Sequence, residues 1–538
     1  MKDKFIPVLN SLYGIANKFD DISTQSKAAM LASLSTIVLP EAKYILQYHD
    51  LLIFLCACPD NSTIRRLAEK ELKRITVYAK KNRSVKKALP DNEGLPFTNI
   101  ITRFSPDFLQ WLLQHPDLNV AFDSFYEPSL PLNDILNITL PSLLKPETTA
   151  GLSNEELLQE LGIPPAQYMP FLLGQLAELK DNPLLKELFT IRMDAYVKLI
   201  PKNEIFSRAY NRIKFKEPYY HQNLLKQFDV AQMINAPFPA YRVPGAAAKQ
   251  ALYKSIRNSM ALTVREIDPA TFLQQDTIRL YDVGRGLTLV IYSMLPERQL
   301  PLETYFGFTF FKNGIPVSYG GIWAFGKLAR LGLNIFEPFR LGESGYILCQ
   351  LIRVLKQAFG VTYFEIEPFQ FGLDNPDGIK SGAFWFYYKF GFRPVDKELK
   401  QLATAEHFKI KKHKAYRSSE KTLLRFTESN LALNLLTGPD PLDVLDINRK
   451  LLSVIKKDWQ LNYTTTRLKA VNAFCKKMNI DQAVLNNIEK NTLEEVALWA
   501  MAMRVSNTQQ LQLMKEMIFT KTKDDYAYQQ LLLDYFQL

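Results

Sequence analysis

The stretch that decides the fold lies at residues 304–323 and reads TYFGFTFFKNGIPVSYGGIW. Its two halves, 304–311 and 316–323, are rich in β-branched and aromatic residues and too short for typical helices, so both are predicted to be strands. Asn313 and Gly314 between them supply the two positive-φ positions of a type I′ turn. The stretch is therefore predicted to form an antiparallel hairpin.

A parallel crossover is predicted directly after the hairpin. The segments 333–339 and 361–367 have the composition of buried strands, and residues 344–359 between them repeat apolar side chains at helical spacing. A strand, a helix and a second strand in this order form a right-handed parallel unit. A helix at 382–390 and a strand at 392–395 complete the prediction of a mixed α/β domain in the middle of the chain.

The regions on either side of this α/β centre are predicted to be helical. Apolar residues recur at helical spacing through the first 235 residues and again after Phe426. The stretch 236–245 holds three prolines and a glycine, which is typical of a connector. The prediction is an N-terminal helical domain at 1–240, an α/β domain at 241–428 and a C-terminal helical domain at 429–538.

An anion-binding loop is indicated at residues 340–345, which read RLGESG and lead into the helix 344–359. Two glycines at a helix start leave backbone amides bare, so phosphate oxygens approach closely and meet the positive end of the helix dipole. A turn that only starts the helix is the structural alternative. The residues predicted to bind the anion are Arg340, Gly342, Glu343, Ser344 and Gly345.

A second motif, YYKFGF at 387–392, joins the loop motif in a resemblance to GNAT-type N-acyltransferases. The order of the predicted elements is also similar to the fold of that family. The resemblance implies that the loop 340–345 cups the pyrophosphate of acetyl-CoA or another acyl-CoA. The family loop reads Gln or Arg, two residues, Gly, one residue, then Gly or Ala. Arg340 and Gly345 fit this register, whereas Glu343 stands where the first glycine belongs.

The resemblance also implies a catalytic role for a tyrosine. In that family the acyl thioester lies in the splay between the two central parallel strands, where an amine attacks it and a tyrosine protonates the departing thiolate. Tyr387 is the predicted general acid, and Tyr388 is the other candidate. Both tyrosines also suit a packed aromatic core, which remains the structural alternative.

A general base is predicted on the strand 361–367, whose alternation puts Glu365 and Glu367 on one face. Either carboxylate can take the proton of an incoming ammonium if that face lines the cleft. Strand carboxylates are also common without a catalytic role. Five aromatic residues are candidates for the floor of an acceptor pocket or for core packing: Tyr319, Trp323, Phe325, Phe369 and Phe371.

The formal charge of +11 is modest for 538 residues and does not by itself indicate a nucleic-acid partner. The densest basic run, at 409–425, contains one central aromatic, Tyr416, and favours a solvated face over a polyanion site. Four cysteines and five histidines show no disulfide or metal spacing, so no metal is predicted. The N-terminus lacks an apolar signal core and the longest apolar run, 51–58, is too short to span a bilayer, which predicts a cytoplasmic protein without a membrane partner.

The resemblance implies three candidate functions. The first is acyl-CoA-dependent N-acyltransfer to an unidentified amine. The second is aminoacyl-tRNA-dependent peptidyl transfer on the same fold, with the basic run 409–425 holding the transfer RNA. The third is a non-catalytic GNAT-like scaffold whose flanking helices bind a protein partner, and the altered glycine register of the loop motivates it.

Overall fold

The computed structural model of the chain describes residues 4–82, 89–149, 151–179, 183–340, 342–436, 438–458 and 462–538. These residues fall into two compact units. The first unit comprises Met1–Asn223, Gln250–Thr271 and Lys312–Pro316. The second unit comprises Leu224–Lys249, Phe272–Phe311 and Val317–Leu538.

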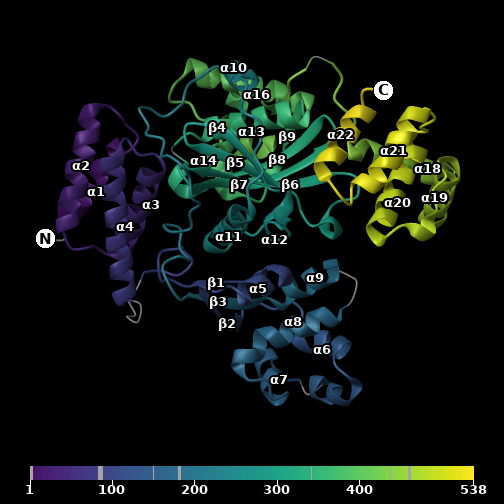
Figure 1. Ribbon diagram of the computed structural model, residues 1–538, viewed down its shortest axis with the longest axis horizontal. Helices are drawn as coiled ribbons and strands as arrows, with labels where there is room; N and C mark the ends of the chain where they lie inside the picture. The colour runs from purple at the N-terminus through teal and green to yellow at the C-terminus, as the bar shows by residue number, and fades with distance from the viewer. Residues whose placement is uncertain are drawn as a thin grey trace. The chain divides into compact units, whose positions relative to one another are not determined.

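A group of four helices opens the first unit (Figure 1). These helices are α1 (Phe5–Ile15), α2 (Asp21–Thr36), α3 (Ala42–Ala57) and α4 (Ser62–Asn82). In α4 the apolar residues Ile64, Leu72 and Ile75 are buried, while the opposite face is charged. Burial of one apolar stripe stabilises such helices far more than intrinsic propensity does.

A three-stranded sheet in the first unit was not predicted within the mostly helical N-terminal region. The elements of this part are α5 (Pro106–Leu113), α6 (Leu132–Thr139), α7 (Asn154–Glu160), α8 (Tyr168–Glu178), α9 (Pro183–Met193), most of α11 (Ala246–Thr263), α12 (Asp268–Thr271), β1 (Ile100–Thr102), β2 (Leu118–Phe125) and β3 (Ala195–Pro201). The strands pair antiparallel in the order β1-β3-β2. Along β3 buried and half-buried residues alternate at every position, and this period of two is the strand signal.

The second unit is built on an eight-stranded sheet (Figure 1). Its strands are β4 (Arg279–Gly284), β5 (Leu287–Tyr292), β6 (Thr304–Lys312), β7 (Ile315–Phe325), β8 (Leu328–Ile335), β9 (Tyr363–Ile366), β10 (Arg393–Pro394) and β11 (Leu431–Asn434). Their order is β10-β11-β9-β8-β7-β6-β5-β4. The predicted hairpin is confirmed as β6 and β7, because Asn313 (φ 47°) and Gly314 (φ 81°) form the turn with two positive φ angles.

The predicted parallel crossover joins β8 to β9 through α13 (Ser344–Phe359), which has the predicted bounds. The other pairings given for β8 and β9, with β7 and β11, are antiparallel, so the sheet is mixed. β8 begins at Leu328 and ends at Ile335, earlier than predicted. The reason is Pro338, which lacks the amide that a strand ladder needs and lies in a short 3-10 turn at Glu337–Phe339. A mixed α/β centre with helix-rich flanks is therefore confirmed.

Two strands of the eight-stranded sheet were not predicted. β4 lies at one edge of the sheet, and β11 lies between β9 and β10 and pairs antiparallel with both. β11 has four residues, too few for a clear period of two. The boundary predicted between the α/β domain and the C-terminal helical domain, at residue 428, therefore falls just before β11, a strand of the eight-stranded sheet.

The second unit also contains a series of further helices. They are α10 (Val230–Asn235), α14 (Pro376–Ser381), α15 (Ala383–Lys389), α16 (Lys397–Lys412), α17 (Glu420–Phe426), α18 (Val444–Asp458), α19 (Tyr463–Met478), α20 (Asn487–Ala502), α21 (Thr508–Thr520) and α22 (Asp525–Tyr535). The last five share a core that includes Trp499, Met514 and Tyr528. From α18 onward the described chain is helical, in agreement with the prediction.

A buried lysine joins these C-terminal helices to the sheet. Lys521, between α21 and α22, is 2% exposed, and burial lowers its pKa below the ordinary value. Its Nζ donates to Asp525 Oδ1 at 2.9 Å, to Thr304 Oγ1 at 3.2 Å and to the carbonyl oxygen of Glu303 at 3.1 Å. A buried charge held by three acceptors is costly to unpair, so it fixes these helices against the start of β6.

Replacement of Gly320 by alanine is expected to destabilise the second unit. A Cβ at Gly320 would overlap the carbonyl oxygen of Gly332 on the neighbouring strand and the ring of Phe308. Overpacking of this kind costs about 1–3 kcal/mol of unfolding free energy, measured by urea denaturation.

The matched control is Gly174→Ala in α8, where no atom lies near the new Cβ. This change is expected to raise stability by about 0.5–1 kcal/mol, because alanine suits a helix interior better than glycine. A Gly320→Ala variant as stable as the unmodified chain would contradict the packing described for β7 and β8.

Candidate active site

The two parallel strands of the crossover separate at a defined point. β8 and β9 pair from Leu328 opposite Tyr363 to Leu331 opposite Ile366. β9 ends there, whereas β8 continues to Ile335 and remains paired with β7. The sheet therefore opens on the β9 side of β8, at the carboxyl ends of both strands, where ligands bind in open α/β sheets.

A glutamine side chain reaches into this opening. The backbone amide of Leu333, beyond the last residue of β8 that pairs with β9, donates to Gln370 Oε1 at 3.2 Å. Gln370 belongs to the short 3-10 turn Pro368–Phe371 that follows β9. The side-chain amide thus replaces the missing strand as partner for one backbone group of β8.

The predicted anion-binding loop lies beside the opening, at the start of α13. Glu343 precedes the first residue of the helix but does not cap it with its side chain. The carboxylate is buried, and its Oε1 accepts from the Leu225 amide at 2.8 Å and from Arg285 Nη2 at 2.9 Å. Arg285 therefore neutralises the acidic residue of the loop motif.

The other loop residues also make contacts within the fold. The Gly342 amide donates to the Phe339 carbonyl oxygen at 3.0 Å, and the Ser344 hydroxyl donates to the carbonyl oxygen of Arg340 at 3.1 Å. The Arg340 side chain is exposed, and its Nε lies 3.4 Å from the Ile335 carbonyl oxygen. Leu341, in the middle of the motif, lies outside the described residues.

The two sequence motifs meet in space. A Cβ at Gly345 would overlap the ring of Phe390, which follows α15. Phe390 in turn stacks on Phe228, with ring centroids 6.1 Å apart. The glycine thus admits an aromatic ring beside the first turn of α13, a packing role that the sequence alone does not reveal.

Tyr387 and Tyr388 have different surroundings. Tyr387 is 4% exposed and packs edge-on against Phe392, with centroids 5.8 Å apart. Burial raises the pKa of Tyr387 above its ordinary value, so its hydroxyl keeps its proton at neutral pH. Tyr388 lies under the guanidinium of Arg393, 3.7 Å from the ring centroid, and contacts the His407 ring.

Glu365 belongs to a buried ionic cluster around Arg330. Arg330 Nη1 lies 3.0 Å from Glu303 Oε1, and its Nε lies 3.3 Å from Glu365 Oε2. The third carboxylate in contact with the guanidinium is Asp443. Burial raises the pKa of Glu303 and of Glu365, while Arg330 opposes that shift. Glu365 Oε2 also accepts from Asn430 Nδ2 at 3.1 Å, so one oxygen of this carboxylate contacts both partners.

Glu367 does not share that environment. β9 ends at Ile366, so the strand alternation that groups Glu367 with Glu365 does not extend to it. Glu367 is exposed and stands at the start of the turn that carries Gln370. Of the two predicted bases, it is the one with access to an incoming molecule.

The five aromatic residues proposed for an acceptor pocket do not form one surface. Trp323 stacks on Tyr305 at 4.2 Å between centroids, and Tyr319 stacks on Phe336 at 5.1 Å. Phe325 is fully buried against Trp499 of the C-terminal core. The remaining two residues differ in solvent exposure: Phe371 is buried, whereas Phe369 is 53% exposed.

Sequence reasoning missed Arg285, Glu303, Arg330 and Asp443. Two of the partners of Arg330, Glu303 and Asp443, lie 27 and 113 residues away, and no local pattern links them to it. One signal in the sequence could have indicated the cluster. A single arginine lies within the apolar run of β8, and a buried arginine requires carboxylate partners.

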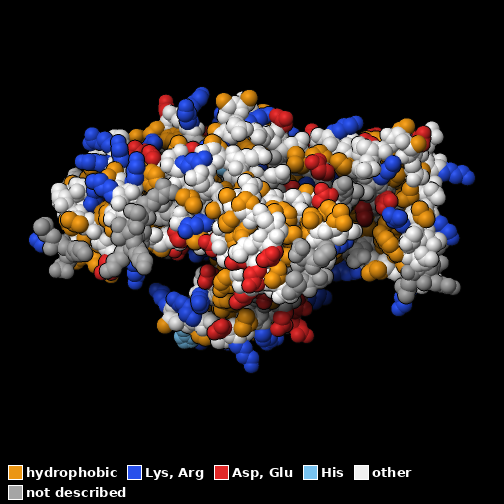
Figure 2. All heavy atoms as spheres, turned by 90° about the horizontal axis from the view of Figure 1, so that it is seen from below, with side chains coloured by type: hydrophobic (Ala, Val, Ile, Leu, Met, Phe, Trp, Pro, Cys, Tyr) orange, Lys and Arg blue, Asp and Glu red, His pale blue; other side chains and the backbone are white. Residues whose placement is uncertain are grey.

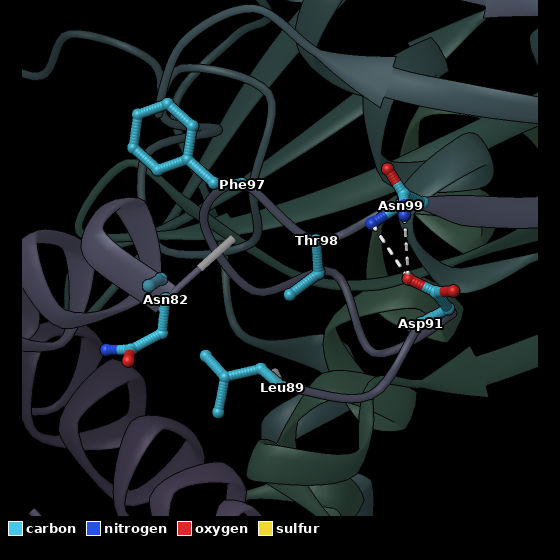
Figure 3. Close-up of a pocket in the computed structure, with 7 residues that line it drawn as sticks. Asn82, Leu89, Asp91, Phe97, Thr98 and Asn99 are labelled. Carbon is cyan, nitrogen blue, oxygen red and sulfur yellow. Dashed lines mark hydrogen bonds between the residues drawn. The ribbon is translucent and has the colours of Figure 1, made fainter. Parts of the chain in front are cut away.

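A pocket in the first unit is too small for a coenzyme (Figure 3). Its volume is about 40 Å³, and it is lined by Ala79, Asn82, Leu89, Asp91, Phe97, Thr98 and Asn99. Asn99 donates to Asp91 Oδ1 on one side, as the dashed lines in Figure 3 show. At about 10–15 Å³ for each water, the pocket holds a few water molecules.

Replacement of Arg330 by glutamine is expected to lower the unfolding free energy of the second unit by about 3–5 kcal/mol at neutral pH, because one buried and two half-buried carboxylates lose their cation. Without Arg330 the pKa values of Glu303 and Glu365 rise further above 4.5, the ordinary value. A carboxyl with a raised folded-state pKa costs stability once the pH exceeds its unfolded value. The loss is therefore expected to grow as the pH rises from about 4.5, in urea titrations at several pH values.

The control is Glu367→Gln, which changes an exposed carboxylate and is expected to alter stability by less than about 0.5 kcal/mol. A loss for Arg330→Gln that shrinks with rising pH would contradict the assigned sign of these shifts.

Comparisons with family models, with curated proteins and with solved structures found no match for this chain. Within the described residues, no group of His, Cys, Asp and Glu side chains is arranged to hold a metal ion. Each helix of the described ranges is too short or too polar to cross a lipid bilayer. The case for a function therefore depends on the residues and contacts given above.

Proposed function

We propose that the second unit is an acyl-CoA-dependent N-acyltransferase, which moves an acyl group from coenzyme A to an amine. The observation that carries this proposal is the separation of β8 from β9 beyond Leu331 and Ile366, next to the start of α13. In the GNAT-type enzymes that the chain resembles, the donor thioester lies in such an opening, and its pyrophosphate meets the helix start. The arrangement in this sheet suits that mode of binding.

The charge at the helix start supports a phosphate ligand. Glu343 would repel phosphate if its carboxylate were free, but Arg285 neutralises it at 2.9 Å. Arg340 adds an exposed cation on the same loop. The positive end of the α13 dipole acts in the same direction, so the local field favours an anion.

Tyr387 is the proposed general acid for the departing thiolate. Its raised pKa keeps the hydroxyl protonated, which is the state that a proton donor needs. The contact of Phe390 with Gly345 holds the segment after α15 against the first turn of α13. Tyr387 is thereby carried on an element that is anchored at the proposed coenzyme site.

The amine acceptor must lose a proton before or during attack on the thioester. Glu367 is the proposed base, because it is exposed and follows β9 at the edge of the opening. Glu365 is bound by Arg330 and Asn430 and is assigned a positioning role on β9. Gln370, three residues after Glu367, holds the exposed edge of β8.

A second candidate function is a non-catalytic scaffold of the same fold. The specific observation in its favour is that the Gly342 amide, the Glu343 carboxylate and the space beside Gly345 are all used within the fold. In that case the helical regions serve a protein partner, and coenzyme binding is absent.

Coenzyme binding separates the two candidates. Acetyl-CoA at 100 times its Kd is expected to stabilise the second unit by about 2.7 kcal/mol, seen as an upward shift in Tm. Absence of any shift at millimolar acetyl-CoA, together with no turnover across a panel of primary amines, would remove the enzyme proposal and leave the scaffold.

Replacement of Tyr387 by phenylalanine is expected to lower kcat by about 100-fold or more, since proton donation to a leaving group contributes this much. The affinity for acetyl-CoA, measured by titration calorimetry, is expected to stay unchanged because the ring is retained. Tyr388→Phe is the matched control and is expected to keep its rate, because Tyr388 packs under Arg393. Equal rates for the two variants would exclude Tyr387 as the general acid.

A further inference from the structure

The outward face of α4 in the first unit is strongly basic. Five exposed cations lie on it: Arg66, Lys70, Lys73, Lys80 and Lys81. At about 100° per residue, they occupy an arc of about 100° around the helix axis. At about 1.5 Å of rise per residue, they extend over about 22 Å. The face is therefore a straight row of positive charge.

These charges are not neutralised within the described part of the chain. No ion pair to a described residue is formed by Arg66, Lys70, Lys73 or Lys81. The two acidic residues of the helix pair with arginines outside the row: Glu71 with Arg74 at 2.6 Å, and Glu69 with Arg65 at 3.2 Å and Arg212 at 3.4 Å. Figure 2 shows Lys and Arg side chains gathered over the helices α1–α4 of the first unit.

The helix that carries this row is held firmly. Its apolar face, which includes Ile64, Leu72 and Ile75, is buried, and the helix packs against α2 and α3. A helix that binds in a membrane interface inserts its apolar face into the lipid. That face of α4 is already occupied, so the exposed row can act only through charge.

We propose that the basic face of α4 binds the phosphate backbone of a nucleic-acid duplex, without regard to base sequence. A duplex presents phosphates at its outside in a regular array, and a charged row of about 22 Å meets several of them. Proteins that bind single strands add aromatic side chains on which bases stack. The exposed apolar residue within this row is Val77, which offers no such surface. The proposal does not depend on the acyltransferase activity.

The basic run at 409–425 is less suited to the same task. Lys409 pairs with Glu406 at 2.8 Å, and Arg417 donates to the carbonyl oxygens of Lys414 and Tyr416. Lys411 and Lys412 lie in the last turn of α16, where cations interact favourably with the helix dipole. Substitutions in this run therefore supply a control that removes the same amount of positive charge.

The test measures fluorescence anisotropy of a labelled DNA duplex of about 24 base pairs with the full chain, from about 50 to about 200 mM salt. The triple variant Arg66→Gln, Lys70→Gln and Lys73→Gln removes three cations and keeps good helix formers. Loss of three phosphate contacts is expected to reduce the slope of log K against log salt by about 2.7.

Two controls make the outcome decisive. The triple variant Lys411→Gln, Lys412→Gln and Lys414→Gln is expected to keep the slope of the unmodified chain. The charge-retaining variant Arg66→Lys, Lys70→Arg and Lys73→Arg is expected to keep it as well, which separates loss of charge from loss of structure.

Three results would overturn the proposal. One is no anisotropy change with the unmodified chain at the lowest salt. Another is a slope that falls with the 411–414 variant and not with the α4 variant. The third is α4-dependent sedimentation with phosphatidylserine vesicles but no duplex binding, which would assign the row to a membrane surface instead.

Discussion

One buried arginine fixes the geometry on which the second unit depends. Arg330 on β8 contacts Glu365 on β9, and also Glu303 and Asp443 from distant parts of the chain. The Arg330 and Glu365 pair stands one residue before Leu331 and Ile366, where the two strands end their pairing. The ionic contact therefore holds the strands together immediately before they part. A guanidinium this deeply buried needs its carboxylates, so the position of the opening is set by charge as well as by backbone.

Local sequence signals predicted the elements whose causes are local. The Asn313 and Gly314 pair determines its turn by itself. The helical spacing of apolar residues correctly predicted both ends of α13. β11 was missed because four residues become a strand only through their partners β9 and β10. The sheet of β1, β2 and β3 was missed because its alternation was judged within a region dominated by helical spacing.

The candidate site was only partly predictable for the same reason. Residues 340–345 and 387–392 were singled out one motif at a time, and the structure brings them into contact through Phe390 and Gly345. The partner of Glu343 is Arg285, 58 residues earlier, so its neutralisation could not be read from the motif. Strand alternation made Glu365 and Glu367 equal candidates for the base, whereas in the structure Glu365 is buried and Glu367 is exposed.

The long-range contacts of α22 have a consequence for how the protein folds during its synthesis. Tyr528 donates to the Leu302 carbonyl oxygen at 2.7 Å, and Gln529 donates to those of Gly326 and Phe359 at 2.6 and 3.0 Å. These acceptors flank β6, β7 and α13, yet they lie 170 to 226 residues before their donors on α22. These contacts cannot form until α22 has been synthesised, and during that interval the apolar surface that α22 covers is a substrate for chaperones.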